Sequence, residues 1–126
     1  MRNESYTFKS VDLNANRTEL HDLLKLTGCE VSINSVEPNS QSPFFHYHKQ
    51  NEEVYVVLEG SGFVYADGET IKVEKGSVFR MAPSVKRCIK AKENGMRYLC
   101  IQCKENSLTQ FTFGDGAIDK TIEWKI

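Results

Sequence analysis

Two histidines separated by one residue, with a pair of glutamates soon after them, form the densest group of potential metal ligands in the sequence. They lie in the stretch FFHYHKQNEEVYVVLEG, residues 44–60. On an extended strand His46 and His48 would point to the same side, roughly 6 to 7 Å apart, close enough to share one ion. Polar residues 49–52 predict a turn, and the apolar run Val54–Leu58 predicts a strand that returns antiparallel to the first. This turn would carry a carboxylate back toward the two imidazoles.

Two neutral imidazoles and one carboxylate are a usual ligand set for a divalent ion such as zinc, nickel, iron or manganese, and they leave coordination positions open. By position alone, either Glu52 or Glu53 could supply the carboxylate. Paired histidines also occur as exposed or hydrogen-bonded residues that bind no metal. The group therefore supports a metal site as a hypothesis.

The spacing resembles the first sequence motif of the cupin family, GxxxxxHxHxxxxExxxxxxG. His46, His48, Glu53 and Gly60 fall in register with it, whereas Ser40 stands where the motif opens with glycine. The resemblance implies that two histidines and a glutamate bind a metal inside a small β-barrel. It selects the second glutamate, because only Glu53 leaves six residues before the glycine.

The segment GSVFRMAPSVKR is similar to the second cupin motif, GxxxxxPxGxxH, which would supply a fourth ligand. Gly76 and the region of Pro83 align, but Ser84 replaces the second glycine and Arg87 replaces the histidine. Arginine stays protonated and has no lone pair for a cation. Two outcomes remain open: a three-ligand site beside which Arg87 holds an anionic ligand, or a metal-free barrel in which Arg87 pairs with Glu53.

Two further side chains are expected near the site. Tyr55 shares a strand face with Glu53, and Gln102 shares one with Tyr98 and Cys100. We interpret Tyr55 and Gln102 as substrate contacts or as ordinary filling of the barrel. The cysteines are expected to be buried, reduced thiols that bind no metal.

Length and charge limit the other possibilities. With 126 residues the chain is expected to form a single domain, and its net charge of −1 makes nucleic acid an improbable partner. Neither a membrane span nor a secretory signal is evident, so the expected compartment is the cytoplasm. His21 is expected at the surface, without a role.

Turn signals every eight to ten residues predict an all-β fold. Together with the resemblance they indicate a cupin-like double-stranded β-helix, or jelly-roll barrel, with its core at about residues 31–103. We expect an N-terminal strand and a short helix within residues 1–28, and C-terminal strands within 104–126. The expected elements are strands at Tyr6–Val11, Cys29–Val36, Lys86–Ala91, Met96–Cys103 and Leu108–Phe113, a helix between Asn16 and Gly28, and turns at Asp67–Gly68, Lys75–Gly76 and Asn94–Gly95.

The strand Val54–Leu58 is apolar on both faces, so something outside the barrel should cover it. The N-terminal helix could do so, or a second subunit, and we expect a homodimer.

For function, the resemblance implies a small metal-dependent enzyme, such as a dioxygenase or isomerase, acting on a small polar or anionic metabolite. A non-catalytic barrel that binds a sugar or other metabolite, with or without metal, remains open because no further general acid or base is evident. A structural barrel without any ligand remains open as well.

Overall fold

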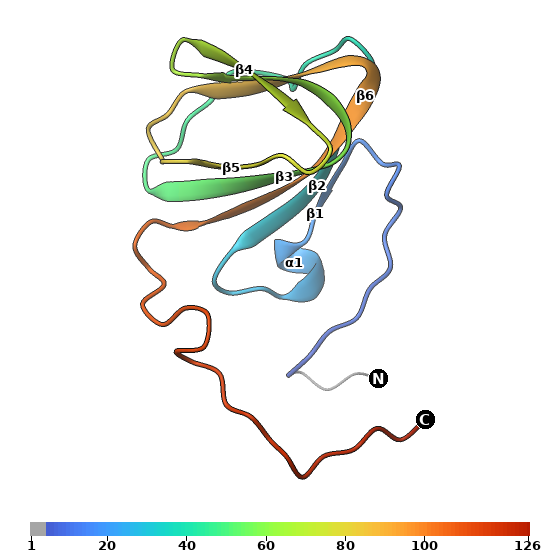
Figure 1. The fold of residues 1–126 in the computed structure, drawn as a ribbon, viewed down its shortest axis with the longest axis vertical. Coiled ribbons are helices and arrows are strands. Elements are labelled where there is room, and N and C mark those ends of the chain that lie inside the picture. Colours follow the sequence, from blue (N-terminus) through green and yellow to red (C-terminus); the bar gives the residue numbers. More distant parts are fainter. Residues whose placement is uncertain (1–4) are drawn as a thin grey trace.

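The computed structural model describes residues 5–126 and consists of one antiparallel sheet rolled into a barrel (Figure 1). Neighbouring strands follow the order β1-β2-β6-β3-β4, and β5 also pairs with β3. The strands are β1 (Arg17–Glu19), β2 (Glu30–Val36), β3 (Asn51–Ala66), β4 (Glu69–Glu74), β5 (Val78–Met81) and β6 (Arg87–Lys104), and the helix α1 spans His21–Leu24. This architecture confirms the predicted all-β jelly roll. Within the described residues, no helix is long and apolar enough to cross a membrane.

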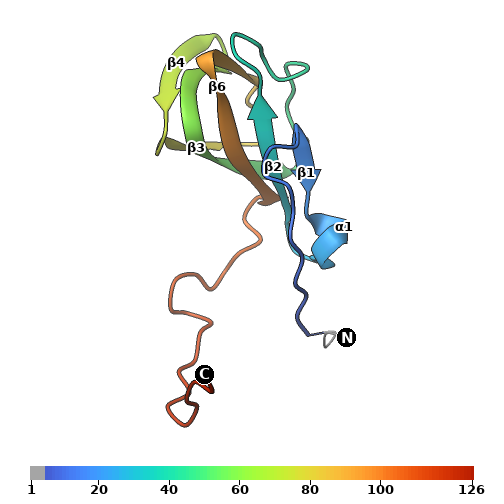
Figure 2. The same ribbon diagram turned by 90° about the vertical axis from the view of Figure 1, so that its right-hand side faces the viewer.

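The two longest strands build the barrel. β3 has 16 residues and β6 has 18, and they pair with each other along most of their length. The first half of β3 also pairs with β5 and the second half with β4, and the long strands curve so that the sheet folds over into a barrel (Figures 1 and 2). A side chain at Gly62 would place its Cβ 2.0 Å from the carbonyl oxygen of Lys90. Glycine is therefore required where β3 and β6 approach closely.

Alternation along the strands sends one set of residues into the barrel. Val57 and Val64 of β3 and Ile89 and Tyr98 of β6 are among the buried core residues. Polar groups share this interior, because Ser32, Asn34, Glu53 and Arg87 are also buried. A buried charged side chain is stable only when it is paired or hydrogen-bonded, so the partners of Glu53 and Arg87 outline the candidate site.

Several predicted turns and strands agree with the structure. Asp67 and Gly68 connect β3 to β4 in a tight hairpin, and β2 occupies most of the predicted strand Cys29–Val36. The turn predicted at Asn94–Gly95 is wrong, because β6 continues through it. Gly95 instead adopts a φ of 71° within the strand, where its would-be Cβ lies 2.9 Å from the carbonyl oxygen of Val36.

The predicted N-terminal elements are largely wrong. No strand forms at Tyr6–Val11, and the helix is limited to His21–Leu24. Asn16 does not cap it, because Arg17–Glu19 pair with β2 as an edge strand. The carboxylate of Glu30 instead accepts two backbone N–H groups at the helix start, at 3.1 and 2.9 Å. Pairing with β2 outweighs the local helical pattern.

The C-terminal segment also differs from the prediction. Residues 105–126 contain no strand, so the strand expected at Leu108–Phe113 and the C-terminal strands expected within 104–126 are wrong. Figures 1 and 2 show this tail running away from the barrel. Without a neighbouring strand its backbone has no ladder to join.

Candidate metal and ligand site

The floor of the site is formed by paired residues of β3 and β6. Glu53 lies opposite Gln102, and Tyr55 lies opposite Cys100. Alternation turns Glu53, Tyr55 and Cys100 into the barrel, where all three are buried. This pairing brings a carboxylate, a phenol and a thiol together.

The histidines come from the segment that precedes β3 rather than from a regular strand. His46 forms an isolated bridge with Arg87, in which each backbone N–H donates to the other carbonyl at 3.0 Å. The backbone N–H of His48 donates to the carbonyl of Pro83 at 2.8 Å. These bonds fix the segment across the barrel mouth, and the two imidazole rings lie 5.3 Å apart.

Both imidazoles turn toward Glu53. The Nε2 atom of His46 lies 3.5 Å from Oε1 of Glu53, and the Nε2 atom of His48 lies 3.4 Å from Oε2. Burial lowers the pKa of the His46 imidazole, and the nearby Arg87 cation adds to this effect, although the Glu53 carboxylate opposes it. His46 is therefore neutral at pH 7, as a metal ligand must be.

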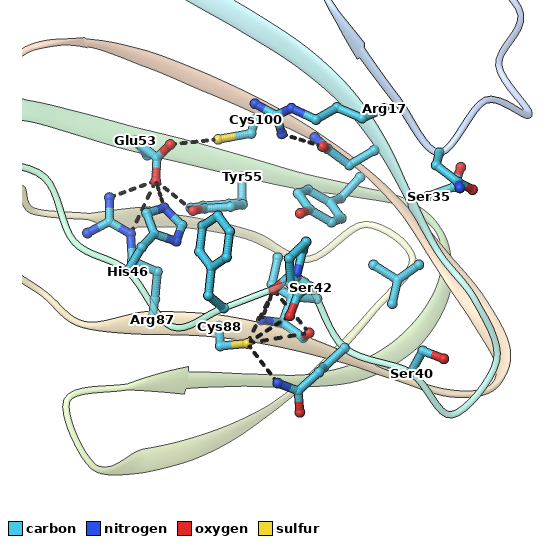
Figure 3. Close-up of a pocket in the computed structure, with 18 of the residues that line it drawn as sticks. Arg17, Ser35, Ser40, Ser42, His46, Glu53, Tyr55, Arg87, Cys88 and Cys100 are labelled. Atoms are coloured by element: carbon cyan, nitrogen blue, oxygen red, sulfur yellow. Dashed lines mark hydrogen bonds and ion pairs between the residues drawn. The ribbon is translucent and has the colours of Figure 1, made fainter.

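The carboxylate of Glu53 accepts hydrogen bonds on both of its oxygens. Oε1 accepts from the hydroxyl of Tyr55 at 2.6 Å and from Nη2 and Nε of Arg87 at 2.6 and 3.2 Å. Oε2 accepts from the Cys100 thiol at 3.2 Å. Burial acts to raise the pKa of Glu53, but these donors outweigh it and lower the pKa to about 2. Glu53 is thus a stable anion (Figure 3).

The guanidinium of Arg87 is held as firmly as its partner. Its side chain is 1% exposed, and Nη1 donates to backbone carbonyls of residues 82, 83 and 85 in the preceding turn. Of the two outcomes that the sequence left open, the structure contains the ion pair between Arg87 and Glu53. Glu52 points elsewhere, because it accepts a hydrogen bond from Arg80 on the exterior at 3.2 Å.

The residues present fit a divalent ion. Ligand atoms bound to one ion at about 2.1 Å lie about 3.0 Å apart at right angles and about 3.4 Å apart at tetrahedral angles. One ligand atom from each of His46, His48 and Glu53 lies within 4.8 Å of the other two. The buried Nε2 of His48 also has no hydrogen-bond partner among the described residues, although it lies within ion-pair distance of Glu53. A bound metal would satisfy such a buried ring nitrogen.

Comparison with known proteins agrees with this geometry. A model of the cupin domain matches residues 33–102, which is more than half of the chain. The chain belongs to the cupin family. A search of curated proteins found no significant match.

Solved structures support the same assignment. The crystal structure of a cupin protein from Bacteroides fragilis is 47% identical, with a TM-score of 0.87, and the alignment covers 94% of this chain and 99% of that one. A cupin 2 conserved barrel domain protein from Salinispora arenicola is 16% identical, with a TM-score of 0.64 and coverage of 76% and 81%. A predicted oxalate decarboxylase from Thermotoga maritima is 18% identical, with a TM-score of 0.51 and coverage of 60% and 64%. The last two establish likeness of fold alone.

In this cupin, the site opens into a cavity of about 620 Å³. It is large enough for a small metabolite beside the histidines. Tyr55 and Gln102, which were predicted near the site, both line it, and Gln102 also accepts a hydrogen bond from Asn51 at 3.0 Å. The burial of Tyr55 and Cys100 raises the pKa of each group, so both keep their protons at pH 7.

Sequence reasoning missed the opposite wall of the cavity. Arg17 of β1 donates to Oδ1 of Asn34 at 2.6 Å, and the amide of Asn34 donates to Ser32 at 2.9 Å. Arg17 and Asn34 line the cavity, and Figure 3 shows Arg17 near Cys100. The polar residues Ser32 and Asn34 alternate with apolar ones along β2, which was a usable signal, whereas Arg17 was assigned to a helix. The cavity therefore has a second cation.

Proposed function

We propose that this cupin binds a divalent metal ion through His46, His48 and Glu53 and takes a small anionic metabolite into the adjoining cavity as the substrate of a metal-dependent reaction. The observation that carries the proposal is the convergence of three ligand atoms, one of which is a buried imidazole nitrogen that has no hydrogen-bond partner within residues 5–126. A bound ion of this kind supplies Lewis acidity or, if it is redox-active, access to dioxygen chemistry.

Charge favours an anionic ligand. The Arg87 cation and the Glu53 anion cancel each other, and imidazoles bind a metal in their neutral form, so a divalent ion would bring two uncompensated positive charges into the barrel. Arg17 on the far wall adds to the positive potential, although Glu19 partly offsets it at 3.0 Å. A carboxylate or phosphate ester of small size would neutralise this excess.

Two protein groups beside the cavity act as hydrogen-bond donors that hold Glu53 in place, and they do not act as bases. Tyr55 and Cys100 hold their protons at pH 7 because burial raises the pKa of each, and both donate to Glu53. These bonds, together with Arg87, fix the orientation of the carboxylate. A rigid carboxylate costs little to organise when a ligand arrives.

The direct test is elemental analysis of untagged protein purified without chelator and then incubated with zinc, nickel, iron or manganese. We expect near-stoichiometric metal in the parent and its loss in His48→Ala. His21→Ala is the matched control, because the His21 side chain is 45% exposed and its imidazole bonds to Asp22 within α1, away from the site. Equal metal content in the parent, His48→Ala and His21→Ala would show that His48 is not a metal ligand. Malonate and phosphate should then stabilise the metal-loaded protein against heat more than the metal-free protein.

One observation favours a second candidate function, a metal-free barrel that binds a metabolite without turning it over. Arg87 and Tyr55 already supply Glu53 with three hydrogen bonds on one oxygen. If the parent stays empty with every ion, while malonate or phosphate still raises its melting temperature, this candidate replaces the first.

A further inference from the structure

The outer surface of the sheet is apolar across four adjacent strands. Cross-strand pairing places the side chains in two rows, one running from β2 through β6 to β3 and the other continuing onto β5. We call these residues the outer face: Val31, Ile101 and Val54 in the first row, and Ile33, Leu99, Val56 and Val78 in the second. They alternate with the inward residues of the site, so they point away from the barrel.

This outer face is left open to solvent in one copy of the chain. Val78 is 69% exposed and Val54 is 40% exposed, and the other five members are partly exposed. The N-terminal helix, which was one of the two covers that the sequence left open, is only four residues long and has no buried residue. Large continuous apolar surfaces of this kind mark interaction sites.

The C-terminal tail carries matching apolar surface. Seven large side chains within residues 105–126 are between 70% and 109% exposed: Leu108, Phe111, Phe113, Ile118, Ile122, Trp124 and Ile126. The tail starts at the border of the outer face, because Lys104 is the last residue of β6 and pairs with Asn51 at the start of β3. In Figures 1 and 2 it leads away from the barrel of its own chain.

We propose that this cupin is a homodimer in which the tail of each copy packs on the outer face of the other. Side chains of this size bury on the order of 150 Å² each, so one tail offers roughly 1,000 Å². Two tails and the faces beneath them exceed the roughly 1,200 to 2,000 Å² of a standard stable interface.

A second copy is favoured because one chain carries both the exposed apolar face and the exposed apolar tail that would cover it. The crystal structure from Bacteroides fragilis aligns over 94% of this chain, so the alignment must extend into the 22 residues of the tail. The related chain therefore has residues that correspond to at least part of this tail. The border beyond the first row is also polar, since Arg80 pairs with Glu52 and Glu105 at 3.2 and 3.7 Å. An apolar centre with a charged rim is the usual anatomy of a protein interface.

The mass in solution tests this proposal. Sedimentation equilibrium at about 10 µM should give about twice 14.4 kDa for the parent and 14.4 kDa for Val78→Lys and for Phe113→Asp. Ile71→Lys is the matched control, because Ile71 is 44% exposed on β4, outside the outer face, and this variant should remain dimeric. Circular dichroism checks that each exposed substitution leaves the fold intact.

Trp124 is the sole tryptophan and reports where the tail lies. Its emission should be blue-shifted in the dimer and move to the red in Val78→Lys. A monomeric parent with red emission would overturn the proposal, and a monomeric parent with blue emission would show that the tail docks on its own barrel. Dimers that survive Val78→Lys would place the interface elsewhere, and dimers that survive Phe113→Asp would exclude the tail from it.

Discussion

Replacing Arg87 by methionine should destabilise the metal-free protein by about 3 to 5 kcal/mol at pH 7, and the loss should shrink in acid. Methionine keeps much of the length of the side chain and removes the cation. Glu53, which is 4% exposed, would then carry an uncompensated charge inside the barrel. Breaking a buried pair by removing one partner typically costs this amount.

The pH dependence follows from the pKa of Glu53. Its donors lower the pKa from 4.5 to about 2 in the folded protein. Each unit corresponds to about 1.4 kcal/mol, so ionised Glu53 contributes about 3 kcal/mol above pH 4.5 in the parent. That contribution is lost as the pH falls from 4.5 toward 2. In the variant the pKa of Glu53 rises, so the folded state no longer gains from ionisation and the two proteins converge in acid.

Urea unfolding of chelator-treated protein at pH 7 and pH 3 measures the difference. Arg80→Met is the control, since Arg80 is 59% exposed and pairs with Glu52 at the surface, where such pairs contribute about 1 kcal/mol or less. A difference between parent and Arg87→Met below about 1 kcal/mol at pH 7 would refute the reasoning. So would a large difference that is the same at both pH values, because it would arise from packing alone.

Two other substitutions test the geometry. Tyr55→Phe removes one donor to Oε1 of Glu53, so acid unfolding should begin at higher pH, with about 1.5 to 3 kcal/mol lost at pH 7; an unchanged acid midpoint would contradict the bond. Gly62→Ala should cost several kcal/mol, because its Cβ would lie 2.0 Å from the carbonyl oxygen of Lys90, whereas Gly28→Ala meets nothing within 4 Å and should be nearly neutral. Equal melting temperatures for the two alanine variants would show that the strands can separate there.

The parts of the fold that could be predicted are those governed by local chemistry and by spacing. The hairpin at Asp67–Gly68 needs positive φ at both residues, and this sequence is well suited to it. Glu53 follows the histidines at a spacing that matches the cupin motif, and the structure does turn it inward. Val54–Leu58 also proved to be a strand, but it is only part of a longer one that passes through Gly60.

The errors arise where long-range pairing overrides a local pattern. Arg17–Glu19 fit the start of a helix until β2 supplies a partner, and this pairing carries Arg17 to the cavity wall. The tail contains apolar residues that suit a strand, yet none of the strands that the structure describes pairs with residues 105–126. Neither outcome is encoded within a short window of sequence, because each depends on what lies opposite.

The arginine that stands in place of the expected fourth ligand changes the charge of the site. With a neutral histidine at position 87, the negative charge of Glu53 would partly balance a divalent ion. With Arg87 present, the arginine cation already neutralises that negative charge through the ion pair. A metal in this barrel therefore needs an accompanying anion more than one in a four-ligand site would. By thermodynamic linkage, an anion that strengthens metal binding is itself bound more tightly when the metal is present, by the same factor. Candidate ligands should therefore be screened with metal and anion supplied together, because Arg87 and Glu53 already balance each other and either ligand alone would bring an uncompensated charge into the site.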